Sequence, residues 1–188
     1  MMKPSIHLFA PLLSCLLAVS AGAAETKVAL NYEAASSDVV AKPVAGACAI
    51  NIVSISDQRP TKDGIGADMP VPTDSPEPFI SASLDALKEY GFTVSHSKTA
   101  VPQAVNLDVR LIRAYTWFGH MRINAMVALD VTAQGAAQEK FRATGSKANM
   151  WGAQSEHVTA LNYATNTMLA SMAPALAAHC GKAGIAAR

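Results

Sequence analysis

An acidic and a basic side chain stand two residues apart where an apolar run of the sequence ends. Asp57 and Arg59 follow this run, and Pro60 comes directly after them. Arginine offers a planar fork of donors that matches a carboxylate, and loops at the ends of strands commonly carry function. The pattern predicts either a recognition corner, in which Arg59 binds a partner's carboxylate, or a local pair, in which Asp57 caps its own turn and holds Arg59.

A second group of candidate residues is aromatic. Tyr115, Trp117 and Phe118 stand close together just before Gly119 and His120. Large aromatic side chains are costly to leave in water, so a patch of them often marks a contact with a partner or a membrane. Trp117 and Phe118 are therefore candidate partner-binding residues, and the alternative is that the aromatic rings fold over the end of a sheet.

The sequence lacks the patterns that would indicate catalysis or metal binding. It has no G-x-S-x-G elbow, and Asp63-Gly64-Ile65-Gly66 is not followed by the Lys-Ser of a phosphate loop. The histidines do not have the spacing of metal ligands. We therefore predict no catalytic residue, no metal and no cofactor. The histidines considered are His96, His120, His157 and His179.

Two cysteines, Cys48 and Cys180, follow the N-terminal segment. In an oxidising compartment an even pair is typically a disulfide. Such a bridge would tie the start of the first core strand to the end of the last helix. The alternative is a pair of small buried apolar side chains.

The elements that must position these residues are visible as patterns. Residues 48–55 are β-branched and apolar on both faces, as in a central strand, and a loop rich in Gly, Pro and Asp follows over residues 61–74. Alternating runs over residues 105–111 and 123–131 predict a β-hairpin whose turn lies near residues 118–120. After a second turn, a more polar strand over residues 140–149 is expected at a sheet edge.

Two helices are expected on either side of these strands. Ser75 and Pro76 form a start signal, and Gly91 stands where a glycine ends a helix, so the first helix should run from about Pro76 to Tyr90. A long second helix should begin at Ser155, with Pro174 kinking its last turns. Its apolar stripe, which includes Met168 and Met172, is interpreted as core.

The order of elements predicts an α+β two-layer sandwich. We expect a mostly antiparallel sheet of four to five strands, including a short strand over residues 92–94, with two helices packed on one face. Residues 1–24 are predicted to be a signal peptide, and residues 25–45 an extended lead-in that could pair with a sheet edge. Residues 46–180 form the single domain, and residues 181–188 a C-terminal tail.

The apolar strand that runs into Ser56-Asp57-Gln58-Arg59 resembles the YajG-type family of bacterial envelope lipoproteins. Three further segments of the chain, Ala86–Phe92, Val105–Val109 and Met121–Asn124, continue the resemblance. The resemblance implies an envelope location and an α+β domain, but no reaction and no catalytic residue. The family's lipobox cysteine would stand at the end of the leader, whereas Cys15 lies inside its apolar stretch.

The first residues of the chain have the order of charge, apolar core and small residues that a signal peptidase recognises. Lys3 precedes an apolar stretch from Leu8 to Val19, and cleavage is expected near Ala24. The alternative is acylation at Cys15, because Leu12 to Cys15 loosely matches a lipobox. The first outcome predicts a periplasmic protein and the second an outer-membrane lipoprotein.

The charge of the exported chain narrows the range of partners. Lys3 is the one charged residue before Glu25, so the rest of the chain carries 14 basic and 14 acidic residues. A neutral domain without a basic run is a poor candidate for binding nucleic acid, and membrane association is expected only if Cys15 is acylated. We therefore expect a non-catalytic protein that binds another envelope protein as an accessory or assembly factor. The alternative is a small periplasmic enzyme that gathers Asp57, Arg59 and a histidine.

Overall fold

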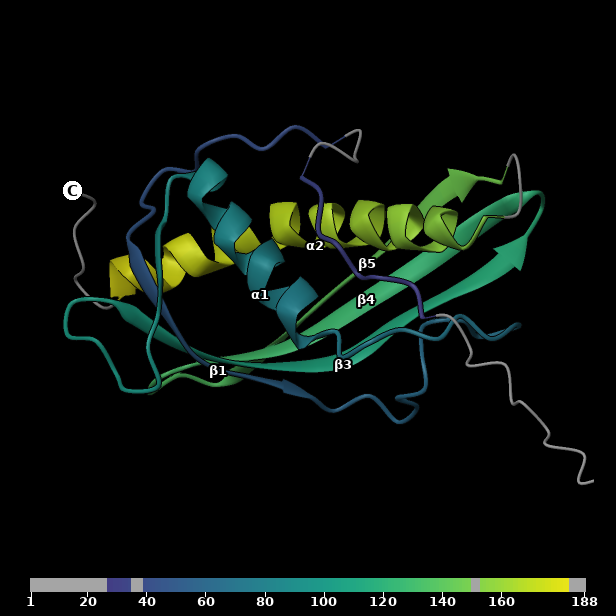
Figure 1. The fold of residues 1–188 in the computed structure, drawn as a ribbon. Helices are drawn as coiled ribbons and strands as arrows, with labels where there is room; N and C mark the ends of the chain where they lie inside the picture. Colours follow the sequence, from purple (N-terminus) through teal and green to yellow (C-terminus); the bar gives the residue numbers. More distant parts are fainter. Residues whose placement is uncertain (1–26, 35–38, 150–152, 183–188) are drawn as a thin grey trace, which may run out of the picture.

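A computed structural model of the chain describes residues 27–34, 39–149 and 153–182 (Figure 1). The predicted signal peptide, Cys15 and the final residues 183–188 lie outside this range. The strands of the described chain form one five-stranded sheet in the order β2-β1-β3-β4-β5. The strands are β1 (Ala49–Asp57), β2 (Thr93–His96), β3 (Val105–Gly119), β4 (Arg122–Ala133) and β5 (Gln138–Ala148). The helices are α1 (Glu77–Asp85), its 3-10 continuation η1 (Ala86–Tyr90) and α2 (Gln154–Lys182).

The sheet is mixed. β1 pairs in parallel with both β2 and β3, and the β3–β4 and β4–β5 pairs are antiparallel. The parallel pairs arise because α1 and η1 carry the chain from β1 back to the start of β2, which is the usual way to join parallel strands. The predicted α+β sandwich is confirmed, with parallel pairing around β1.

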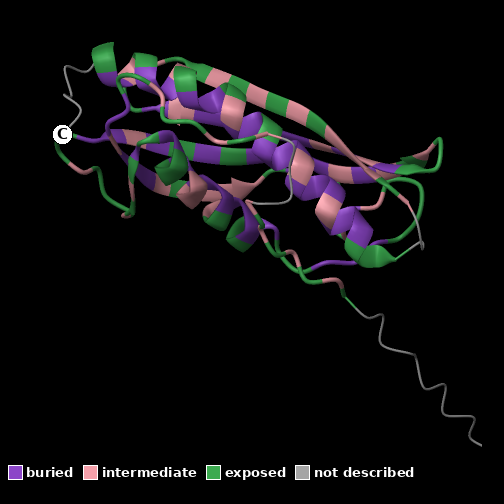
Figure 2. Cartoon of the chain, turned by 90° about the horizontal axis from the view of Figure 1, so that it is seen from above, coloured by how far each residue is buried: buried purple, intermediate pink, exposed green. Residues whose placement is uncertain are grey.

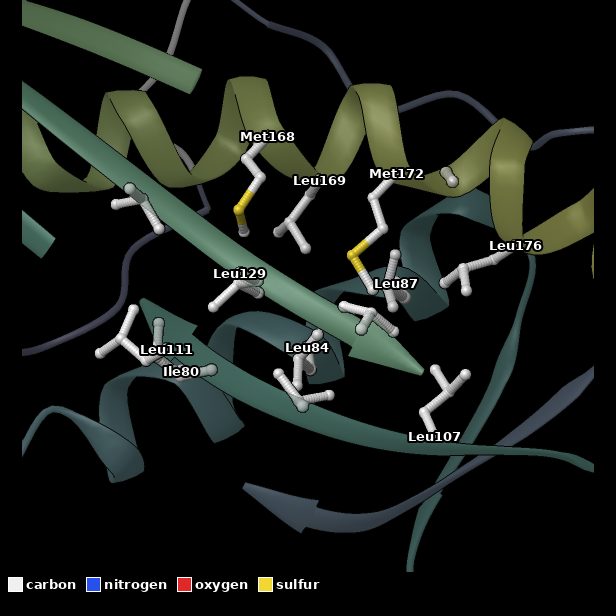
Figure 3. Packing of buried hydrophobic residues seen from close by; sticks show 14 of the residues in the cluster. Ile80, Leu84, Leu87, Leu107, Leu111, Leu129, Met168, Leu169, Met172 and Leu176 are labelled. Carbon is white, nitrogen blue, oxygen red and sulfur yellow. The ribbon is translucent and has the colours of Figure 1, made fainter. Parts of the chain in front are cut away.

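Both helices cover the same face of the sheet (Figure 1). Met168 of α2 points toward Leu129 of β4, and Met172, one turn further along α2, extends beside Leu87 of η1 (Figure 3). These side chains are fully buried. The methionine stripe is therefore core, as the sequence predicted, and no helix among the described residues covers the opposite face of the sheet.

The β3–β4 hairpin is longer than its alternating pattern indicated. Its turn consists of His120 and Met121, both with positive φ (51° and 57°), as in the type I′ turns that suit the twist of a hairpin. The predicted turn near residues 118–120 therefore lies slightly too early, because Phe118 and Gly119 still belong to β3. The neighbouring strand β5 alternates between exposed and half-buried residues along most of the sheet edge (Figure 2).

A disulfide joins Cys48, directly before β1, to Cys180 in the last turn of α2. Their Cα atoms are 5.9 Å apart, and the two residues are 132 positions apart in the sequence. The bridge therefore connects the sheet layer to the helix layer at the positions that the sequence predicted.

Within its described residues, the lead-in contacts the loop before α1 and the helix α2. Val28 bridges to Thr73 in the loop before α1, and the side chains of Asn162 and Asn166 hold residues 31–34 against α2 through the backbone. Helix α2 is continuous through Pro174 and ends at Lys182, two residues inside the predicted tail. Neither α1 nor α2 has the length and hydropathy of a membrane span within the described residues.

Candidate functional site

Asp57 and Arg59 form a buried ion pair at the end of β1. The carboxylate of Asp57 accepts hydrogen bonds from Nε and NH2 of Arg59, both at 3.0 Å, and also from the Arg59 backbone N–H. The side chains are 11% and 3% exposed. NH1 of Arg59 donates to the carbonyl oxygens of Gly64 at 2.8 Å and Ala114 at 3.4 Å. The local pair predicted from the sequence is therefore present, and it fastens the following loop to β3.

The electrostatics of the corner follow from this geometry. Burial alone would raise the pKa of Asp57, but the hydrogen bonds and charge of Arg59, together with the charge of Lys62, outweigh burial. The pKa of Asp57 therefore lies below its ordinary value, and the carboxylate stays ionised. The backbone N–H of Asp57 also donates to Glu77 at 3.1 Å, which ties the end of β1 to the start of α1.

The loop after β1 takes the place of a strand along the outer part of β3. Ala67 donates its N–H to the carbonyl of Thr116, and Thr116 donates its N–H to the carbonyl of Ile65. Close packing inside the loop requires glycine, because a Cβ on Gly66 would lie 1.8 Å from the carbonyl oxygen of Met69. The glycine-containing segment, which the sequence indicated to be an irregular loop, thus forms a short strand-like segment beside β3.

A buried histidine supports this segment from the helix layer. Nδ1 of His157, near the start of α2, lies 2.7 Å from the hydroxyl of Thr116, and the Thr116 hydroxyl also donates to the carbonyl of Ile65 at 3.2 Å. Burial lowers the pKa of His157, opposed in part by the charge of Glu156. His157 therefore links α2, β3 and the loop in its neutral form.

The described chain has several surface grooves. One of about 480 Å³ lies beside the Asp57–Arg59 pair. We call it the corner groove. It runs between the loop after β1 and the outer part of β3, and more of its lining is apolar than polar. Its lining residues are Arg59, Pro60, Thr61, Gly64, Ile65, Gly66, Ala67, Arg113, Ala114 and Tyr115.

The structure brings the two sequence-predicted regions together. Tyr115 lines the corner groove, and its ring packs against Trp117 with 5.5 Å between the ring centroids. Trp117 is half-buried on the open face of the sheet, whereas Phe118 at the strand end is 49% exposed. Arg59 lines the groove, and the carboxylate of Asp57, which does not line it, accepts hydrogen bonds from the Arg59 guanidinium.

Arg113 is the groove residue that the sequence analysis missed. A bulge between Leu111 and Arg113 shifts the register of β3, so that Ala114 and Thr116 point inward and Arg113, Tyr115 and Trp117 point outward. The signal was the break in the alternating pattern after Leu111. A simple period of two would have placed these side chains on the wrong faces.

The charged side chains at the groove differ in how far the fold already engages them. The carboxylate of Asp57 and the guanidinium of Arg59 bind each other and the backbone, whereas Arg113 is exposed beside the ring of Tyr115. An exposed arginine next to an aromatic ring is a common composition for a protein-binding surface. Among the described residues, no group of three or more His, Cys, Asp or Glu side chains is arranged to hold a metal ion.

Comparison with known proteins supports the fold. A protein of Xanthomonas campestris described by the family label DUF330 superposes with a TM-score of 0.51 at 11% identity, over 85% of this chain and 98% of that protein. At this identity the similarity establishes a shared fold and nothing about activity. No family model and no curated protein matches the sequence, so the YajG-type resemblance stays a prediction.

Two further structures are more distant. A minor lipoprotein of Acinetobacter baumannii gives a TM-score of 0.28 at 13% identity, over 72% of this chain and 96% of that protein. A dodecameric PelC protein of Paraburkholderia phytofirmans gives a TM-score of 0.32 at 12% identity, over 70% and 88%. At these TM-scores, neither likeness supports a conclusion about this chain.

Proposed function

We propose that this protein is an exported, non-catalytic accessory protein that binds another protein of the cell envelope through the corner groove and the adjoining Tyr115–Trp117 surface. The observation that carries this proposal is the convergence of the two sequence-predicted regions on one groove. The Asp57–Arg59 pair is bound internally by several hydrogen bonds, so the groove offers a shaped, stable surface with Arg113 and Tyr115 available for contact.

The export part of the proposal depends on the leader and on the disulfide. The leader has the pattern of a cleaved signal peptide, and the Cys48–Cys180 bridge suits an oxidising compartment such as the periplasm. The YajG-type resemblance agrees with an envelope location, either soluble after cleavage near Ala24 or anchored through Cys15. Mass analysis of the protein isolated from cell fractions distinguishes the two forms.

Site-specific crosslinking in intact cells tests the binding part. A photoreactive residue replaces Tyr115 in one variant. In the control it replaces Lys98, an exposed residue in the loop after β2. We expect a discrete crosslinked product from position 115 that is absent from position 98 and is reduced when Arg113→Ala is added. Capture of the same abundant proteins from both positions would refute groove binding.

A further inference from the structure

Three large apolar side chains are exposed at one end of the molecule. Met69, Phe118 and Met121 are 49%, 49% and 77% exposed. The backbone N–H of Phe118 donates to Asp68 at 3.0 Å, which places the loop that carries Met69 beside the hairpin. The hairpin extends past the start of α2 at this end (Figure 1). We call Met69, Phe118 and Met121 the apolar tip.

The part of the sheet behind the apolar tip is positively charged. Residues 113–119, 122–128 and 142–148 of β3, β4 and β5 contain no Asp or Glu. The carboxylate of Asp68, beside the tip, accepts the N–H of Phe118. The other half of the same strands holds carboxylates as well as cations. The cations of the hairpin half are Arg113, Arg122, Arg142 and Lys147.

Two of these arginines face the open side of the sheet together. Arg113 and Arg142 lie on either side of Ala128 in the register of the three strands. Both are exposed, and among the described residues neither has a hydrogen-bond or ion-pair partner. Their charges are therefore available to an external anion.

We propose that the apolar tip inserts into the surface of a lipid bilayer that carries anionic headgroups, with the cations of the hairpin half binding those headgroups. Apolar side chains gain free energy when they leave water for the boundary between headgroups and acyl chains. Lysine and arginine near the surface add attraction to anionic lipid. From the tip toward the body of the protein the order is apolar and then cationic, so an inserted hairpin places its apolar side chains at the acyl-chain boundary and its cations among the headgroups.

The shape of the tip favours a bilayer over an acidic protein. Successive side chains of a strand alternate between its two faces, so Phe118 and Trp117 point to opposite sides of the hairpin, and Met121 lies at its turn. A bilayer surrounds an inserted tip on every side, whereas a protein surface would cover one side and leave the others in water. This contact shares Arg113 with the corner groove, but the apolar tip lies outside the groove lining, and the contact requires no acyl group on Cys15.

Vesicle sedimentation tests the proposal with protein processed from a precursor that carries Cys15→Ala and therefore cannot be acylated. We expect it to sediment with vesicles of phosphatidylethanolamine and phosphatidylglycerol, and to remain in solution with vesicles of phosphatidylcholine alone. The double variant Phe118→Ser/Met121→Ser should bind the anionic vesicles about tenfold more weakly. The matched control Val40→Ser removes an equally exposed apolar side chain elsewhere and should bind as the parent does.

The charge contribution has its own pair of variants. Arg122→Gln/Arg142→Gln should weaken binding about tenfold at low salt, whereas Lys42→Gln/Lys98→Gln, with the same loss of charge outside the hairpin, should not. Unchanged melting temperatures show that all variants are folded. Absence of binding to anionic vesicles, or full binding by the tip variant, would overturn the proposal. Crosslinking from position 115 is unaffected by either result, so failure here is distinguishable from failure of groove binding.

Discussion

The buried guanidinium of Arg59 connects three segments: the Asp57 side chain at the end of β1, the backbone of the loop at Gly64, and the backbone of β3 at Ala114. Because Asp57 neutralises its charge inside the fold, removing either partner leaves an uncompensated buried group. The corner therefore depends on the pair for its shape, and the groove beside it depends on the corner.

Replacing Asp57 by Asn should destabilise the protein strongly. The amide retains the size of the carboxylate but loses the charge that balances Arg59, so we expect the free energy of unfolding to fall by about 2 to 4 kcal/mol. Urea unfolding followed by circular dichroism measures the change. Asp74→Asn is the matched control, because Asp74 pairs with Lys27 in full contact with solvent and should cost less than about 1 kcal/mol. Equal effects of the two variants would contradict a structural role for the buried pair.

His157 should make stability depend on pH. Its pKa is lowered by burial, so the unfolded chain binds a proton more readily than the folded protein. The stabilising contribution is fully present above the ordinary pKa of about 6.5 and is lost as the pH falls toward the lowered folded-state value. We expect the melting temperature to fall between about pH 6.5 and 5, and His157→Gln to flatten this part of the profile. An unchanged profile in the variant would assign the pH dependence to other groups.

The loop after β1 behaves as an element in its own right, since residues 65–67 occupy the edge of β3 that β1 leaves open. Gly66→Ala should detach it, because the added Cβ would overlap the carbonyl oxygen of Met69. We expect faster hydrogen exchange at the amides of Ala67 and Thr116 and a loss of stability of about 1 to 3 kcal/mol. Gly181→Ala is the control, because nothing lies within 4 Å of a Cβ at that position. Unchanged exchange in Gly66→Ala would show that the loop tolerates a side chain.

Elements with a strong local pattern were predictable from the sequence, and those set by contacts between distant segments were not. The helix from Pro76 ended at Gly91 as expected, since Gly91 adopts a positive φ of 95°. The bulge before Arg113 and the strand-like loop escaped prediction, because each depends on pairing between segments far apart in the sequence. The corner groove contains one predictable and one unpredictable part. Its Asp57–Arg59 ion pair was predictable from a spacing of two residues, whereas the outward position of Arg113 depends on the bulge in β3 and was not.

At the scale of the molecule, the fold separates charges that the sequence mixes. The chain after the leader is neutral, which argued against attraction to anionic surfaces. The long hairpin and β5 nevertheless gather four cations without a carboxylate in one half of the sheet. The net charge of the chain therefore does not indicate that the hairpin half of the sheet is positive. That distribution follows from the register of β3, β4 and β5.

The Cys48–Cys180 bridge acts on the whole molecule, because it closes a loop of 132 positions that contains the entire sheet, all of α1 and nearly all of α2. Cross-linking residues so far apart restricts the unfolded chain, and removing the bridge should lower the free energy of unfolding by about 2 to 4 kcal/mol. The test compares the melting temperature of the native protein with that of Cys48→Ala/Cys180→Ala. A reductant should lower the melting temperature of the native protein and leave that of the variant unchanged. Two alkylatable thiols at these positions in protein isolated from cells would show that the bridge does not form there, and the oxidising compartment inferred from it would lose its support.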